Sequence, residues 1–323
     1  MRAGHASFIR DTGSPCVRAL RAALLVILLS ATPAAAAFPT DGFSYAQPAA
    51  QLVMPFDATE DRVTFALVSN IGGHSPQTST RWTWWSESCE RLADFAICLT
   101  MNDTVVVDPR RTGGVGPANE PLGPAISLDG ERGLLSVTAY ATDAACRPWH
   151  ETGAEIADNH LVGTFTVADL ATTASFANDA LGLGKDAEGH VRLPGDGALT
   201  HLSFDFQTLA PASVEDSFAM LTVLEESDGP VLPAPDPTRF AVTFFDDDEI
   251  PTRLPDQILQ CTWLGRVGGG LIPPQWSFDS SGLVRLQATI DTPRRRFLYG
   301  VAGASVGPYG QTSKLKFTNA YPP

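Results

Sequence analysis

The sequence predicts an all-β protein, built as an antiparallel β-sandwich of either one large unit or two immunoglobulin-like units. Many short segments of the 323-residue chain are rich in β-branched and aromatic residues, which favour strands. Glycine, proline, asparagine or aspartate bounds most of these segments, as is typical of turns. Helical patterns do not alternate with the segments, so a sandwich is favoured over a parallel α/β sheet.

The expected strands run through the whole chain after residue 50. They are 51–56, 62–69, 81–88, 94–99, 104–107, 133–140, 161–167, 199–206, 218–224, 239–245, 257–264, 283–290 and 296–301. One short helix is expected over 168–180, although its threonines are poor helix formers. Segments 109–131 and 225–237 are rich in glycine, proline or acidic residues and predict linkers or long connections.

The first 37 residues predict a secretory signal peptide. An apolar run over 22–29 precedes small residues that end at Ala37, and this order is typical of a cleaved signal. The run is shorter than the about 20 residues that a membrane span needs. The basic residues before it are Arg2, Arg10, Arg18 and Arg21. An unprocessed amphipathic anchor is the alternative.

The predicted organisation is therefore a signal peptide at 1–37, an N-terminal β-sandwich unit at 38–140 and a C-terminal β-rich unit at 141–323. The last unit is either separate from the N-terminal sandwich or continuous with it. No second long apolar stretch follows the signal, so no integral membrane segment is expected after cleavage. The expected location is periplasmic or secreted.

The charge of the chain argues against nucleic acid as a partner. The full sequence has 22 basic and 36 acidic residues, a net charge of −14. Residues 38–323 alone keep 18 basic and 35 acidic residues, a net charge of −17. Phosphate binding needs clustered lysine and arginine, so the partner expected here is an unidentified protein or a glycan.

Four cysteines follow the signal, namely Cys89, Cys98, Cys146 and Cys261. An even number in an exported chain predicts two disulfides. Because 81–88 and 94–99 predict a hairpin, we expect Cys89 to pair with Cys98 and, by elimination, Cys146 with Cys261. A zinc site and a redox pair are the alternatives, but the C-x₂₋₄-C spacing usual for zinc is absent and no C-x-x-C is present.

Two clusters are candidate binding sites. Trp82 and Trp84 should share one face of a strand while Trp85 takes the other; an exposed indole could stack on a sugar, and core packing is the alternative. The acidic run Asp246, Asp247, Asp248 and Glu249 could hold Ca²⁺ at a strand end, and a solvated turn is the alternative. No other cofactor is predicted.

No catalytic motif is complete. The segment 303–307 fits G-x-S-x-G, but no Asp, Glu or His follows Ser305, as the nucleophile elbow of a hydrolase would need. His150-Glu151 begins a zinc-protease motif whose second histidine is missing, because residue 154 is alanine. Carboxylates are plentiful, yet their spacing selects no hydrolytic pair. A non-enzymatic protein is therefore expected.

The segments 52–56, 62–70, 82–87 and 104–108 resemble uncharacterised bacterial exported proteins with immunoglobulin-like sandwich domains. The resemblance covers about 60 residues and rests on apolar strand patterns. It implies a sandwich fold and export, and it brings no catalytic residues. The predicted function is a non-catalytic structural or interaction protein of the bacterial envelope or exterior. The alternatives are a carbohydrate-binding module that uses exposed tryptophan and a carboxylate-dependent hydrolase.

Overall fold

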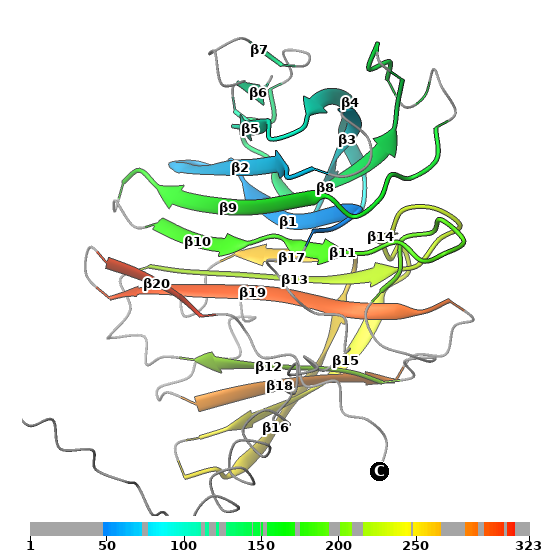
Figure 1. The fold of residues 1–323 in the computed structure, drawn as a ribbon. Helices are drawn as coiled ribbons and strands as arrows, with labels where there is room; N and C mark the ends of the chain where they lie inside the picture. The colour runs from blue at the N-terminus through cyan, green and yellow to red at the C-terminus, as the bar shows by residue number, and fades with distance from the viewer. Residues whose placement is uncertain are drawn as a thin grey trace, which may run out of the picture. The chain divides into compact units, whose positions relative to one another are not determined.

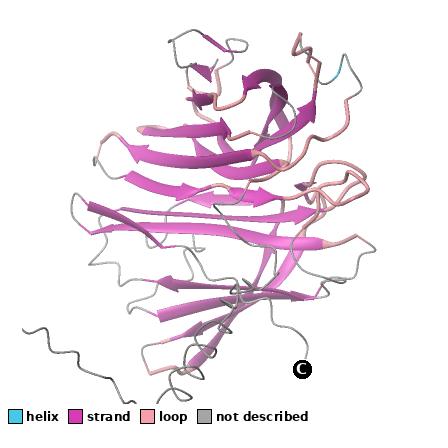
Figure 2. Ribbon diagram, viewed as in Figure 1, coloured by secondary structure: helices cyan, strands magenta, loops and turns pink. Residues whose placement is uncertain are grey.

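The elements of the described chain are twenty β-strands in four antiparallel sheets, which confirms the predicted all-β sandwich class (Figures 1 and 2). The structure is a computed structural model. The residues that it describes lie in one compact unit that spans 42–323. They are 48–72, 77–110, 114–115, 121–122, 127–143, 145–148, 150, 154–171, 175–193, 201–208, 216–246, 248–265, 282–289, 294–306 and 309–313. The predicted signal peptide lies outside them.

The first and second sheets form one sandwich. The first sheet has the order β11 (Leu181–Leu183), β1 (Gln51–Asp57), β8 (Arg132–Ala141), β3 (Gln77–Ser86) and β4 (Arg91–Thr100). The second has the order β10 (Ser175–Asp179), β9 (Leu161–Asp169), β2 (Arg62–Asn70), β5 (Thr104–Val107), β6 (Gly114–Val115) and β7 (Pro121–Leu122). Side chains of both sheets, such as Trp84 and Phe165, lie in one buried cluster.

The third and fourth sheets follow in the chain. The third has the order β12 (His201–Thr208), β18 (Gly282–Thr289), β15 (Thr238–Phe245) and β16 (Pro251–Leu259). The fourth has the order β14 (Leu232–Pro233), β13 (Asp216–Glu225), β19 (Arg296–Val306) and β20 (Tyr309–Ser313), and β17 (Thr262–Gly265) also pairs with β13.

The fourth sheet packs on both of its faces. Met220 and Tyr299 join the core of the first two sheets, whereas Leu221 and Leu298 join the core of the third. Residues 220–226 and 296–301 are buried continuously rather than alternately, as is typical of strands that are covered on both faces.

Strand β1 is buried along its whole length and tolerates a proline for a local reason. All seven of its residues are buried. Its pairing with β11 covers only residues 51–53, whereas its pairing with β8 covers 51–57. Pro55 therefore lies where one edge of the strand is open, a position that does not need its missing N–H.

Strands β2 and β9 alternate between buried and outward-facing residues. In β2, Ala66 and Val68 are buried, whereas Phe65 and Leu67, each one residue earlier, face outward. The central residues of β9 follow the same two-residue period. This period places one face of the second sheet in the core and leaves the other facing outward.

Two local predictions were wrong. The helix expected over 168–180 is instead the end of β9 followed by β10. In β10, Phe176 and Asn178 are buried, and they alternate with the exposed Ser175 and Ala177. That period of two identifies a strand. The strand expected over 257–264 is two strands, β16 and β17, with Cys261 at positive φ between them.

The predicted boundary after residue 140 does not coincide with the end of the first two sheets. Strand β9 pairs with β2, and β11 pairs with β1. The strands of these sheets therefore extend to Leu183. In the described part of the chain, no helix is long and apolar enough to cross a membrane.

Candidate functional site

All four predicted cysteines form disulfides, but the predicted pairing was wrong. The bonds join Cys89 to Cys261 and Cys98 to Cys146, with Cα–Cα distances of 5.4 and 6.0 Å. Cys89 lies in the turn between β3 and β4, whereas Cys98 pairs with Ser79 far along β4. At about 3.4 Å per residue, Cys98 is roughly 24 Å beyond Arg91 at the start of the strand. A disulfide needs Cα atoms within about 7 Å.

The Cys89–Cys261 bond ties the first sheet to the fourth. Its cysteines are 172 residues apart, against 48 for the Cys98–Cys146 bond. Beside it, the Thr262 N–H donates to the Glu87 carbonyl. On the same side of the sandwich, the buried Gln51 amide donates to the Val231 carbonyl and accepts from the Val231 N–H, both at 2.8 Å. Distant parts of the sequence are therefore held together here.

The tryptophans are divided as predicted, but two of them are in the core. Trp82 and Trp84 are 0% and 1% exposed, and the Trp84 ring meets Phe56 edge to face with centroids 4.9 Å apart. Trp85 lies on the other face of β3, is half-buried and donates from Nε1 to the Ser136 hydroxyl at 3.3 Å. An exposed strip for a sugar is therefore lacking at Trp82 and Trp84.

The acidic run after β15 forms a turn. The Asp246 carboxylate accepts the N–H groups of Asp248 and Ile250 at 3.0 and 2.9 Å. Glu249 has φ of 61° and donates its N–H to the Asp246 carbonyl. Asp247 lies outside the described residues. Within the described ranges, no group of three or more His, Cys, Asp or Glu is placed to hold a metal ion.

The G-x-S-x-G segment is strand rather than elbow over its described part. Residues 303–306 end β19, and Ser305 is paired with Asp216 on one side and Gly310 on the other. A nucleophile elbow needs a sharp turn into a helix. The described part of this motif is therefore a paired strand.

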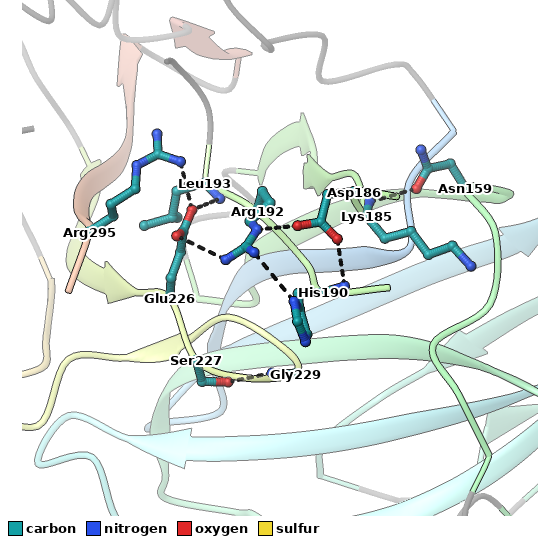
Figure 3. Close-up of polar contacts among 10 residues, drawn as sticks. All are labelled: Asn159, Lys185, Asp186, His190, Arg192, Leu193, Glu226, Ser227, Gly229 and Arg295. Atoms are coloured by element: carbon teal, nitrogen blue, oxygen red, sulfur yellow. Dashed lines mark hydrogen bonds and ion pairs between the residues drawn. The ribbon is translucent and has the colours of Figure 1, made fainter. Parts of the chain in front are cut away.

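An arginine–carboxylate cluster lies where the loop after β11 meets β13 and β19 (Figure 3). Its members are Asp186, Arg192, Glu225, Glu226, Asp236, Arg294, Arg295 and Arg296. The four carboxylates face four guanidinium groups, so the charges balance.

Glu226 is the centre of this cluster. It is 8% exposed and accepts from the Leu193 N–H at 2.8 Å, from Arg295 at 2.9 Å and from Arg192 at 3.4 Å. Figure 3 shows Arg192 and Arg295 approaching it from different segments. The adjacent Glu225 accepts from Arg296 Nε at 2.7 Å. The carboxylates thus hold together three segments of the chain.

Asp186 extends the cluster into the loop after β11. It accepts from the His190 N–H at 2.9 Å and from Arg192 Nε. Burial alone would raise the pKa of Asp186, but these two donors outweigh it and lower the pKa to about 2. The same pairing raises the pKa of Arg192. Both groups are therefore charged over the whole physiological range.

Other ionisable side chains in the sandwich are also held by neighbours. The buried Arg62 lies 3.4 Å from the Asp57 carboxylate and 3.7 Å from that of Asp169. Arg81 donates to both oxygens of Asp94, at 2.9 and 2.6 Å. The hydrogen bond to Asp94 raises the pKa of Arg81. These contacts link neighbouring strands.

His160 is the buried titratable group at the start of β9. Its ring Nε2 shares a hydrogen bond with the Thr78 hydroxyl of β3, and the residue is 3% exposed. Burial lowers the pKa of His160, although contacts with Asp158 oppose this effect. The imidazole is therefore held neutral between the two sheets.

The outward face of β10, β9, β2 and β5 has a different character. Cross-strand neighbours on it include Ala177, Thr166 and Phe65 in one row, and Thr164, Leu67 and Val106 in the next. Phe65 is 41% exposed. We call this surface the uncharged face; its members are Phe65, Leu67, Ser69, Thr104, Val106, Val162, Thr164, Thr166, Ala168, Ser175 and Ala177. Asp179 of β10 also faces outward and pairs directly with Thr164, so one charged residue lies beside these eleven.

Neither the cluster nor the uncharged face was predicted from the sequence. A signal for the cluster was present, because Glu225-Glu226 ends one apolar strand and Arg294–Arg296 begins another. The uncharged face could be found from alternate residues of 62–70 and 161–169, once these are recognised as neighbours. Comparisons of the chain with protein-family models, with curated proteins and with solved structures found no match.

Proposed function

We propose that this chain is an exported, non-catalytic interaction protein of the bacterial envelope or exterior, and that the uncharged face is its contact surface. The main support for this proposal is the composition of that face. Of twelve outward-facing residues on four strands, Asp179 alone is charged, whereas the outer side of a solvated antiparallel sheet is ordinarily polar. Six of these residues are apolar, and apolar surface that faces solvent is typical of interaction sites.

Two further observations support the proposal. The two disulfides favour an oxidising compartment, in agreement with the signal expected at 1–37. The carboxylates that are buried in the described chain, such as Asp57, Asp169 and Glu226, contact arginines that link strands or loops. Their positions thus favour a structural role over acid–base chemistry. The buried indoles of Trp82 and Trp84 disfavour the glycan alternative.

The experiment is site-specific photo-crosslinking in cells that export the protein. A photoreactive amino acid replaces Thr164, on the uncharged face, or Thr252, which is exposed on β16. We expect covalent adducts from position 164 and none above background from position 252. Equal labelling from the two positions, or none from either, would contradict the proposed function.

The same cells test the location. We expect the protein outside the cytoplasm, beginning at Phe38, with four cysteines that react with a thiol reagent only after reduction. A cytoplasmic protein with free thiols would overturn the exported role independently of the crosslinks.

A further inference from the structure

We propose that the bond between Cys98 and Cys146 is a redox site, which an external dithiol opens while the protein stays folded, and that the bond between Cys89 and Cys261 is structural. The site is separate from the uncharged face, because Cys98 lies on β4 of the first sheet and the uncharged face belongs to the second. Its co-substrate is any dithiol that can reach the surface of β4.

The two disulfides differ in how closely a thiol can approach them. Cys98 is exposed on β4 between buried neighbours, and Cys146 is half-buried. Cys261 is 1% exposed. Cys89 is half-buried, and its sulfur lies 3.5 Å from the carbonyl oxygen of Ala234, a residue that is 0% exposed. Exchange depends on access to the attacked sulfur, and exposed disulfides are typically the labile ones.

Cys146 lies in a turn that has hydrogen bonds of its own. The Cys146 N–H donates to the Asp143 carbonyl at 2.9 Å, and the Thr142 hydroxyl donates to the Arg147 carbonyl at 3.1 Å. Arg147 also forms an ion pair with Asp143. These contacts lie within residues 142–147 and do not need the disulfide. The turn can therefore keep Cys146 near Cys98 after the bond opens, so that the bond can close again.

The chain around this turn is anchored without the disulfide. The Ala141 N–H donates to the Glu155 carbonyl at 2.9 Å, and the Ala157 N–H donates to the Ala139 carbonyl at 3.0 Å. Strand β4 pairs with β3 along its whole length, and its buried side chains lie in the core of the first sandwich. Opening the bond therefore frees a surface turn and leaves both sheets of the sandwich paired.

The reaction is a thiol–disulfide exchange in two steps. A thiolate of the dithiol attacks the Cys98 sulfur, which is the exposed one, and forms a mixed disulfide; the electron pair of the broken bond leaves on Cys146, which takes up a proton. The second thiolate then attacks the dithiol sulfur of the mixed disulfide, and Cys98 leaves and takes up a proton. The protein gains two electrons and two protons, and the dithiol becomes a disulfide.

The test is native-state reduction of the purified exported protein with about 1 mM dithiothreitol, followed at intervals by alkylation and peptide mass spectrometry. We expect Cys98 and Cys146 to become labelled at least about 100-fold faster than Cys89 and Cys261, because a buried bond reacts only in molecules that have opened locally. The far-UV circular dichroism should stay unchanged while the fast pair is reduced. In denaturant, where burial is lost, the two bonds should react at rates within a few-fold of each other.

Two results would overturn the proposal: equal rates for both bonds in the native protein, or loss of the sheet signal in step with the opening of the fast bond. The variant Cys98→Ser/Cys146→Ser should lack the fast phase and keep the slow one. A fast phase that survives in this variant would assign it to Cys89 and Cys261, and the proposed site would be wrong.

A monothiol identifies the attacked sulfur. Brief treatment of the native protein with reduced glutathione, followed by alkylation, should leave glutathione on Cys98 and the alkyl group on Cys146, since Cys98 is the more exposed of the two. The reverse distribution would contradict the role of Cys98 as the entry point of the exchange.

Discussion

The two sides of the first sandwich differ in how the chain uses its charges and cross-links. On the side of the fourth sheet, a disulfide, the Gln51–Val231 amide pair and an arginine–carboxylate cluster hold distant segments together. On the other side, the uncharged face carries none of these features among its eleven residues. The first side stabilises one chain, whereas we propose the second as a surface for contact with another molecule.

A second exposed strand sharpens this contrast. Strand β16 lies at the edge of the third sheet and is exposed over most of its length. It contains Pro251 and Pro255, and Arg253 pairs with Asp256 at 2.5 Å. Pro255 falls where the register with β15 shifts. Prolines, charges and bulges are devices that prevent edge strands from pairing with other chains. The uncharged face lies on a sheet face rather than at an edge, and its eleven residues carry no charge.

The largest effect on stability should come from the disulfide on the side of the fourth sheet. Replacing Cys89 and Cys261 together by serine should lower the free energy of unfolding by about 5 kcal/mol, and replacing Cys98 and Cys146 by about 4 kcal/mol. The order follows from the separations of 172 and 48 residues, since longer loops gain more freedom when released. Denaturant unfolding of the two double variants measures both values. A larger loss from the Cys98–Cys146 pair would contradict this account.

The next largest effect concerns the arginine–carboxylate cluster. Glu226→Gln should lower the free energy of unfolding by about 3 kcal/mol, because Arg192 and Arg295 lose a buried charged partner. The control is Glu131→Gln, whose side chain is exposed at the start of β8; it should change stability by less than about 0.5 kcal/mol. If the two variants unfold at the same denaturant concentration, the cluster does not hold the segments together.

These features show where reasoning from the sequence succeeds and where it stops. Strands such as β2 and β9 could be predicted because their alternation is local. The cysteine pairing could not, since proximity in the chain suggested Cys98 for Cys89 and the true partner lies 172 residues away. The burial of Trp84 likewise depends on which sheets stack, as does the pairing of Glu225 with Arg296. Each of these contacts depends on how strands that are far apart in the sequence pair and stack.

A smaller effect should follow the titration of His160. The folded pKa of His160 lies below its usual value of about 6.5, so the unfolded chain binds the proton more readily. Stability should therefore be constant above about pH 6.5 and fall as the pH decreases below it. His160→Gln should remove this part of the pH dependence, and His150→Gln, at an exposed residue, should keep it. Unfolding free energies between pH 5 and pH 8 give the slope; identical slopes in both variants would contradict the assignment.

The smallest effect on stability is expected on the uncharged face, and this is what separates the two sides. Phe65 is already 41% exposed in the single chain, so Phe65→Thr should change the free energy of unfolding at low concentration by about 0.5 kcal/mol or less. Its cost should appear instead in the crosslinks from position 164, whose yield should fall because the exposed ring is lost from the contact surface. Measuring the unfolding free energy and the crosslink yield of the same variant therefore distinguishes a contact surface from a structural one. A large loss of unfolding free energy would mean that Phe65 packs within its own chain, and the contrast between the two sides would fail.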